Sequence, residues 1–132
     1  MKVFLDTNVW LSATVFAGLC AEILAESAQR RALLTTRLVQ AEAHEVLRRK
    51  FSHLPQSLAL FDAIWAEAAC AADVDEPADD SDARLVRAAQ AAGALVFVTG
   101  DRRVLGWGTH GDMQILSPRD AWMRFFVKSG GN

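Results

Sequence analysis

Four acidic residues in separate segments of the chain are the side chains best suited to chemistry. Asp6 directly follows the apolar run VFL, and Asp101 stands shortly after the apolar run ALVFV. Glu42 and Asp82 lie within amphipathic patterns, on rows of the expected helices that otherwise carry apolar side chains. An inward carboxylate costs several kcal/mol unless it meets a cation, a metal ion or hydrogen-bond donors. Each of these acids therefore needs partners.

Glu42 is the most informative of the four. It is spaced four residues from both Leu38 and Val46, beside a second apolar row of Val39, Ala43 and Leu47. Glu45 differs, because it sits beside Ala41, Arg48 and Arg49, where an exposed pair on the helix surface explains it. On its own, Glu42 is compatible with either a structural or a functional role.

Each aspartate also has a simpler explanation as a helix cap. Asp6 and Asp101 both precede expected helical turns, where a side-chain oxygen can accept from a free N–H group. Asp82 would favour the positive end of its helix dipole, with Asp79, Asp80 or Ser81 as the N-cap. Considered singly, none of the aspartates requires a function.

Considered together, the acids predict a metal site. Four carboxylates around one crevice would repel one another and raise each other's pKa, and a divalent cation removes that conflict. Ligation by carboxylate oxygens alone selects Mg²⁺ or Mn²⁺ over zinc. The three histidines are scattered, so a zinc site is not expected: His44, His53 and His110.

The elements that position these acids alternate between strand and helix. Short apolar runs predict strands at residues 2–5, 33–36, 94–98 and 113–116; helical periodicity favours 8–16, 19–30, 37–51, 56–72, 81–92 and 118–126. Such alternation predicts an α/β fold in three layers, with a central parallel sheet between helices. Ligands bind beyond the carboxyl ends of the strands in such folds, which is where Asp6 and Asp101 are expected.

Composition predicts one folded domain over residues 1–128 with a loose tail at 129–132. The 132 residues are 52% hydrophobic and 23% charged, with a formal net charge of -2 that does not exclude a polyanionic partner. Cys20 and Cys70 lie in Ala-rich stretches, and we expect both to be reduced core residues. No apolar run approaches the ~18 residues of a membrane span, so the sequence favours a cytoplasmic protein without a membrane partner.

Four segments carry a resemblance to a known family. VFLDTNVWLSA, the Glu42 helix that ends in EVLRRKF, DDSDARLVRAAQAAGA and the closing VFVTGD resemble the acidic motifs of PIN-domain ribonucleases. The similarity is greatest to the branch that forms the toxin component of toxin–antitoxin pairs. It runs in order from about residue 2 to residue 127, and although each motif alone is weak, four in order are specific.

The resemblance implies a function and roles for particular residues. Asp6, Glu42, Asp82 and Asp101 match the quartet that binds Mg²⁺ or Mn²⁺, while the polar positions at Asn8 and Thr99 support it. It also implies a sheet of about five parallel strands, hydrolysis of single-stranded RNA, and frequently a homodimer that an antitoxin neutralises.

One departure from the family concerns the number of metal ions. Many relatives carry a further acid two residues after the aspartate of the TGD segment, and Arg103 stands at that position here. A second metal ion is therefore in question. The alternative to a ribonuclease is a PIN domain that has lost turnover and binds RNA or a protein partner.

Basic residues are candidates for contacts with RNA phosphates, which position a nucleic acid without reading its sequence. For any single one of them, solvated surface is the better explanation: Arg48, Arg49, Arg102 and Arg103. Two other Mg²⁺-dependent folds fit poorly. A haloacid-dehalogenase-like enzyme would need an aspartate where Asn8 stands, and a response-regulator receiver would need an acidic pair and a lysine that are not evident. Thr7 has no predicted role.

Overall fold

The computed structural model describes residues 1–127 of the chain, so the tail predicted at 129–132 lies outside the described residues. The strands are β1 (Val3–Leu5), β2 (Leu33–Thr35), β3 (Ala69–Cys70), β4 (Val96–Val98), β5 (Thr109–His110) and β6 (Met113–Leu116). The helices are α1 (Thr7–Val15), α2 (Leu19–Gln29), α3 (Arg37–Lys50), α4 (Pro55–Glu67), α5 (Ser81–Ala91), α6 (Arg102–Leu105) and α7 (Pro118–Ala121), followed by the π-helical segment η1 (Trp122–Phe126).

The strands form one sheet in the order β3-β2-β1-β4-β6-β5. All neighbouring pairs are parallel except β5 and β6, which form an antiparallel pair at one edge. The predicted α/β class with a largely parallel central sheet is therefore confirmed. The count of about five strands omits one of the two short edge strands, β3 and β5, each of two residues.

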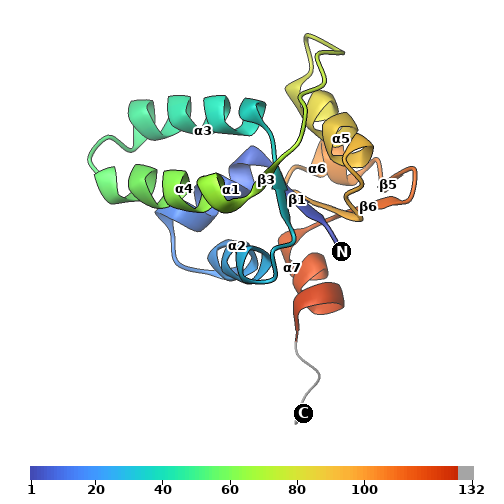
Figure 1. Cartoon of the computed structure of the whole chain (residues 1–132), viewed down its shortest axis with the longest axis horizontal. Helices are drawn as coiled ribbons and strands as arrows, with labels where there is room; N and C mark the ends of the chain where they lie inside the picture. Colours follow the sequence, from blue (N-terminus) through green and yellow to red (C-terminus); the bar gives the residue numbers. More distant parts are fainter. Residues whose placement is uncertain (128–132) are drawn as a thin grey trace.

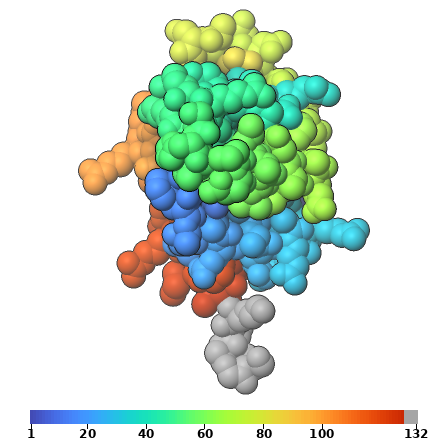
Figure 2. All heavy atoms as spheres, turned by 90° about the vertical axis from the view of Figure 1, so that its left-hand side faces the viewer, coloured from blue at the N-terminus to red at the C-terminus, as the bar shows by residue number. Residues whose placement is uncertain are grey.

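Helices cover both faces of this sheet. Figure 1 shows α1, α2, α3 and α4 on one side of the strands and α5 on the other. Viewed from that first side, α3 and α4 form much of the outer surface, with α2 below them (Figure 2). The arrangement is the three-layer fold that alternating strand and helix predict.

The order in which successive strands are added to the sheet reverses between β1 and β4. From β1 the chain moves outward through β2 to β3, and then returns across the sheet to β4, which pairs with β1 on its other side. The register pairs Leu5 with Val98, so both strands end at the same level. In open α/β sheets, ligands bind at such a switch point, beyond the carboxyl ends of the strands.

A tightly packed core fixes the strands that lead to this point. Phe4 and Phe97 stack across β1 and β4 with ring centroids 5.4 Å apart, and neither is more than 1% exposed. On the helical side, Trp10 of α1 packs against Phe61 of α4 at 5.1 Å. Because these side chains are confined on all sides, the ends of β1 and β4 are held in fixed positions.

Two sequence-based predictions in the middle of the chain are wrong. The helix predicted over 56–72 ends at Glu67, because Ala69 and Cys70 pair with β2 as strand β3. Cys70 is consequently exposed at the edge of the sheet and is not buried in the core. Cys20 is partly buried, which agrees better with the prediction that it is a core residue. Helical composition in this segment is overridden by pairing with a distant strand.

The final predicted helix is present in two parts. Ser117 caps α7 by accepting from the N–H of Asp120 at 3.1 Å, and Pro118 occupies the first turn as expected. From Trp122 the segment continues as η1 to Phe126. Over residues 1–127, no single helix is long and apolar enough to cross a membrane; only the sharply bent pair α1 and α2 reaches that length and composition.

Candidate active site

Asp6 stands at the end of β1 and uses its two oxygens differently. Oδ1 accepts from the backbone N–H of Asn8 at 3.1 Å, which caps α1, and Oδ2 accepts from the hydroxyl of Thr99 at 2.6 Å. The residue is only 4% exposed. The cap and the site are thus not alternatives, because one carboxylate serves both. Asn8 contributes its backbone N–H, and its side chain is exposed.

Thr99 joins Asp6 to Asp101. Its oxygen donates to Asp6 and also accepts from the backbone N–H of Asp101 at 3.0 Å. Asp101 in turn caps α6, with Oδ1 accepting from the N–H groups of Arg103 at 2.8 Å and Val104 at 3.4 Å. The supporting role expected for Thr99 therefore has a geometric basis, since one buried hydroxyl orients two acids.

Glu42 approaches this edge from α3 and is held by Thr7. The Thr7 hydroxyl donates to Glu42 Oε1 at 2.7 Å, and Thr7 itself is buried. Because Thr7 follows Asp6 directly, the first turn of α1 carries one acid of the site and orients another. Sequence reasoning missed Thr7, and its position next to Asp6 was the only signal for it.

The acids act on one another electrostatically. Burial raises the pKa of Asp6, and the nearby charges of Asp82 and Glu42 raise it further. The hydrogen bonds from Thr99 and from the N–H of Asn8 oppose this rise. The charges of Glu42 and Asp82 therefore act on Asp6 in the direction that the sequence predicts for neighbouring carboxylates.

Asp82 has a different partner, which sequence reasoning did not identify. Arg103 donates to both oxygens of Asp80, at 3.0 and 2.8 Å, and to Asp82 Oδ2 at 3.2 Å. Its guanidinium also lies over the ring of Trp107, 5.0 Å from the centroid. Asp80 is the cap of α5, and Arg103 lowers its pKa. Asp82 itself is half-buried, so the predicted inward placement is only partly met.

The donor chemistry of the site fits a hard divalent cation. Within residues 1–127, no ion pair involves Asp6, Glu42 or Asp101. Glu42, Asp82 and Asp101 each hold one oxygen against a protein donor, and the described residues provide no hydrogen bond to the other oxygen. Oxygen ligands of this kind suit Mg²⁺ or Mn²⁺.

The described part of the chain contains no ready-made ligand set. No three acidic, histidine or cysteine side chains in it are grouped closely enough to hold a metal ion as they stand. Each of three acids has an oxygen held by a protein donor instead, namely Thr99 for Asp6, Thr7 for Glu42 and Arg103 for Asp82. Metal binding at this edge would therefore require these side chains to rearrange.

The four arginines predicted to contact RNA have different surroundings in the structure. Arg49 pairs with Glu45 at 2.7 Å on the outer face of α3, which confirms the exposed pair predicted there. Arg48 is exposed about 9 Å along the helix axis from Glu42, given six residues at 1.5 Å each. Arg102 is exposed at the start of α6, beside Asp101. Arg103 is engaged by Asp80 and Asp82, so it is not a freely extended surface side chain.

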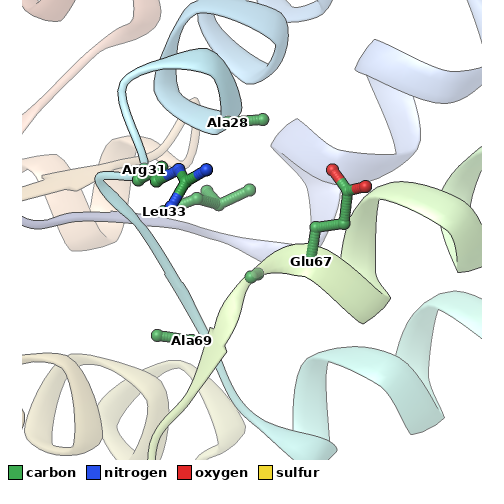
Figure 3. A pocket seen from close by; sticks show the side chains of 6 residues that line it. Ala28, Arg31, Leu33, Glu67 and Ala69 are labelled. Carbon is green, nitrogen blue, oxygen red and sulfur yellow. The ribbon is translucent and has the colours of Figure 1, made fainter.

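A separate cleft lies towards the other end of the strands. It has a volume of about 470 Å³ and is lined by Ala28, Arg31, Leu33, Glu67, Ala68 and Ala69, near the amino ends of β2 and β3. Figure 3 shows Arg31 and Glu67 on opposite sides of its opening. Its lining includes one acid and none of the four predicted site residues. The cleft is therefore separate from the region around Asp6, Glu42, Asp82 and Asp101, which we call the acidic edge.

The comparisons with known proteins bear on the fold. No family model matches the sequence, and no curated protein matches it. Among solved structures, the chain is similar to PAE2754 from Pyrobaculum aerophilum, with a TM-score of 0.65 and 16% sequence identity over 94% of this chain and 88% of that one. A likeness at this identity supports the α/β architecture and leaves the function to be inferred from the site.

Proposed function

We propose that this chain is a metal-dependent ribonuclease of the PIN type that hydrolyses phosphodiester bonds of single-stranded RNA with Mg²⁺ or Mn²⁺. The observation that carries the proposal is that hydrogen bonds and charge link Asp6, at the carboxyl end of β1, to the three other acids. Asp6 and Asp101 are joined by Thr99, while Glu42 and Asp82 both raise the pKa of Asp6. The order of the acidic motifs along the sequence supports the same class.

The residues of the site divide the work between holding a cation and orienting ligands. Asp6, Glu42, Asp82 and Asp101 would together hold the divalent ion. When bound, the ion supplies Lewis-acid stabilisation of the phosphodiester and lowers the pKa of an attacking water. Thr99 and Thr7 keep Asp6, Asp101 and Glu42 in place through their hydrogen bonds. Arg102, exposed beside Asp101, is placed to contact an RNA phosphate.

The biological setting belongs to the same proposal. The motif pattern supports a toxin of a toxin–antitoxin pair that acts in the cytoplasm as a homodimer and is neutralised by an antitoxin protein. A small overlapping reading frame upstream of the gene would support this role, and an isolated gene would argue against it.

A second candidate function is a PIN domain without turnover that binds RNA or a protein partner. The observation in its favour is that Arg103 forms ion pairs with Asp80 and Asp82, and that protein donors hold an oxygen of every predicted metal ligand. Such a site would keep its shape without metal.

The two candidates are separated by an RNA-cleavage assay on purified protein. Wild type, Asp6→Asn and the control Asp112→Asn are incubated with single-stranded RNA and Mg²⁺ or Mn²⁺, with and without EDTA. Asparagine can also serve as an N-cap, so we expect the variant to fold. Asp112 is an exposed acid between β5 and β6, outside the four motifs. Cleavage by wild type and Asp112→Asn alone, abolished by EDTA, is expected. Equal cleavage in every sample would reveal contamination and contradict the proposal. RNA binding without cleavage would favour the second candidate.

A further inference from the structure

The side chain of Arg103 contacts three residues at the acidic edge. Two nitrogens of the guanidinium pair with both oxygens of Asp80, and one of them also reaches Asp82. The guanidinium carbon also lies over the ring of Trp107, 5.0 Å from its centroid, where the aromatic ring attracts a cation. A two-pronged pair between arginine and carboxylate has a defined geometry as well as a charge. Arg103 is thus a positioned cation.

The position of Arg103 is tied to the proposed metal ligands on both sides. Its backbone N–H donates to Asp101 Oδ1 at 2.8 Å, so the main chain of this residue contacts Asp101 while its side chain pairs with Asp82. The charge of Asp82 in turn acts on Asp6, whose pKa it raises. The positive charge of the guanidinium therefore lies on the α5 side of the same acidic group.

Among residues 1–127, the acids on the α5 side have an arginine as ion-pair partner, and the acids on the side of Asp6 and Asp101 have none. Asp80 and Asp82 share one arginine, whereas the described residues provide no ion pair to Asp6, Glu42 or Asp101. A cation from solution gains most where the carboxylates lack a protein cation. On the α5 side it would have to displace a guanidinium that is held by two acids and a tryptophan.

We infer that Arg103 takes the place of a second cation at this edge, so that the site binds one divalent ion, on the side of Asp6 and Asp101. This inference rests on the proposed metal-dependent function and specifies the stoichiometry of its centre. Asp82 then serves both cations: its Oδ2 pairs with Arg103, and its other oxygen, which accepts no hydrogen bond among residues 1–127, would be available to the ion. Arg103 is a positioning residue, because it acts through Asp82 and Asp80.

The test counts bound Mn²⁺ by isothermal titration calorimetry and by electron paramagnetic resonance of free Mn²⁺. Wild type, Arg103→Asp, Arg103→Gln and the control Arg102→Asp are compared at the same ionic strength. Arg102→Asp changes the net charge as Arg103→Asp does, at an exposed neighbour with no ion pair among residues 1–127. Thermal melting in EDTA confirms that each variant is folded. Arg103→Gln serves in place of Arg103→Asp if the latter fails to fold.

One Mn²⁺ per chain is expected for wild type and for Arg102→Asp, and two for Arg103→Asp. Arg103→Gln should bind the second ion at least tenfold more tightly than wild type does. Two ions on wild type, or one ion on both Arg103 variants, would overturn the inference and leave the proposed metal-dependent function intact. No ion on any variant would defeat the proposed metal centre itself, together with the inference that rests on it.

Discussion

The acidic edge has two halves, one at the end of β1 and one at the start of α5, and their carboxylates have different surroundings. At the end of β1, Asp6 is almost fully buried, has no ion-pair partner among residues 1–127, and has a raised pKa. At the start of α5, the exposed pair of Asp80 with Arg103 lowers the pKa of Asp80. Among residues 1–127, Arg103 gives the α5 half a cation, and no ion pair reaches Asp6, Glu42 or Asp101 in the other half. The other half is the place where a cation from solution would be stabilised.

Removal of one charge from each half should have very unequal effects on metal binding. We expect Asp6→Asn to weaken Mn²⁺ affinity by more than about 100-fold, beyond the 10- to 100-fold typical of residues that only orient a ligand. Asp80→Asn should weaken it by less than about tenfold on the same scale. Calorimetric titration of both variants measures the ratio. Equal losses would mean that the two halves form a single site and would contradict the division.

The buried hydroxyl of Thr99 should matter more for stability than any contact on the Arg103 side. Thr99→Val preserves shape but leaves Asp6 Oδ2 without its donor, which should lower the free energy of unfolding by about 1–3 kcal/mol. Urea denaturation measures this change, with the exposed Thr109→Val as the matched control, expected to change it by less than about 0.5 kcal/mol. A loss no larger than that of Thr109→Val would show that Asp6 is not held through Thr99.

The raised pKa of Asp6 should also appear in the pH dependence of stability without metal. The folded state holds the Asp6 proton more tightly than the unfolded state, whose carboxyl titrates near 3.8. The contribution of Asp6 is therefore fully present below that pH and is lost as pH rises through the raised folded-state pKa. The free energy of unfolding of wild type minus that of Asp6→Asn, measured by urea denaturation in EDTA, should fall over this range. A difference that increases with pH would mean that Asp6 is stabilised as an anion.

Much of the fold and of the acidic edge was predictable from sequence because the signals are local. Short apolar runs ending in polar residues mark β1 and β4, and parallel strands bring their carboxyl ends to one edge. The helical period then identifies Glu42 as an acid on an inward row. These signals predicted the α/β class and the residues to examine.

The features that the sequence did not predict depend on contacts between distant segments. The bond from Thr7 to Glu42 spans 35 residues, and the pair of Arg103 with Asp80 spans 23. Strand β3 forms within a stretch of helical composition because its backbone pairs with β2. Neither periodicity nor propensity specifies such partners, since both describe neighbours along the chain. The pairing of Arg103 with the acids of α5, which distinguishes the two halves of the acidic edge, could therefore be found only from the structure.

The most direct test of this division is the position of bound manganese in a crystal grown with Mn²⁺. Anomalous scattering at the manganese edge locates the ion independently of catalytic activity. The division predicts a single peak in contact with Asp6 and Asp101, with the Arg103 side chain still paired to Asp80. A peak between Asp80 and Asp82 with Arg103 displaced, or no peak beside Asp6, would contradict it.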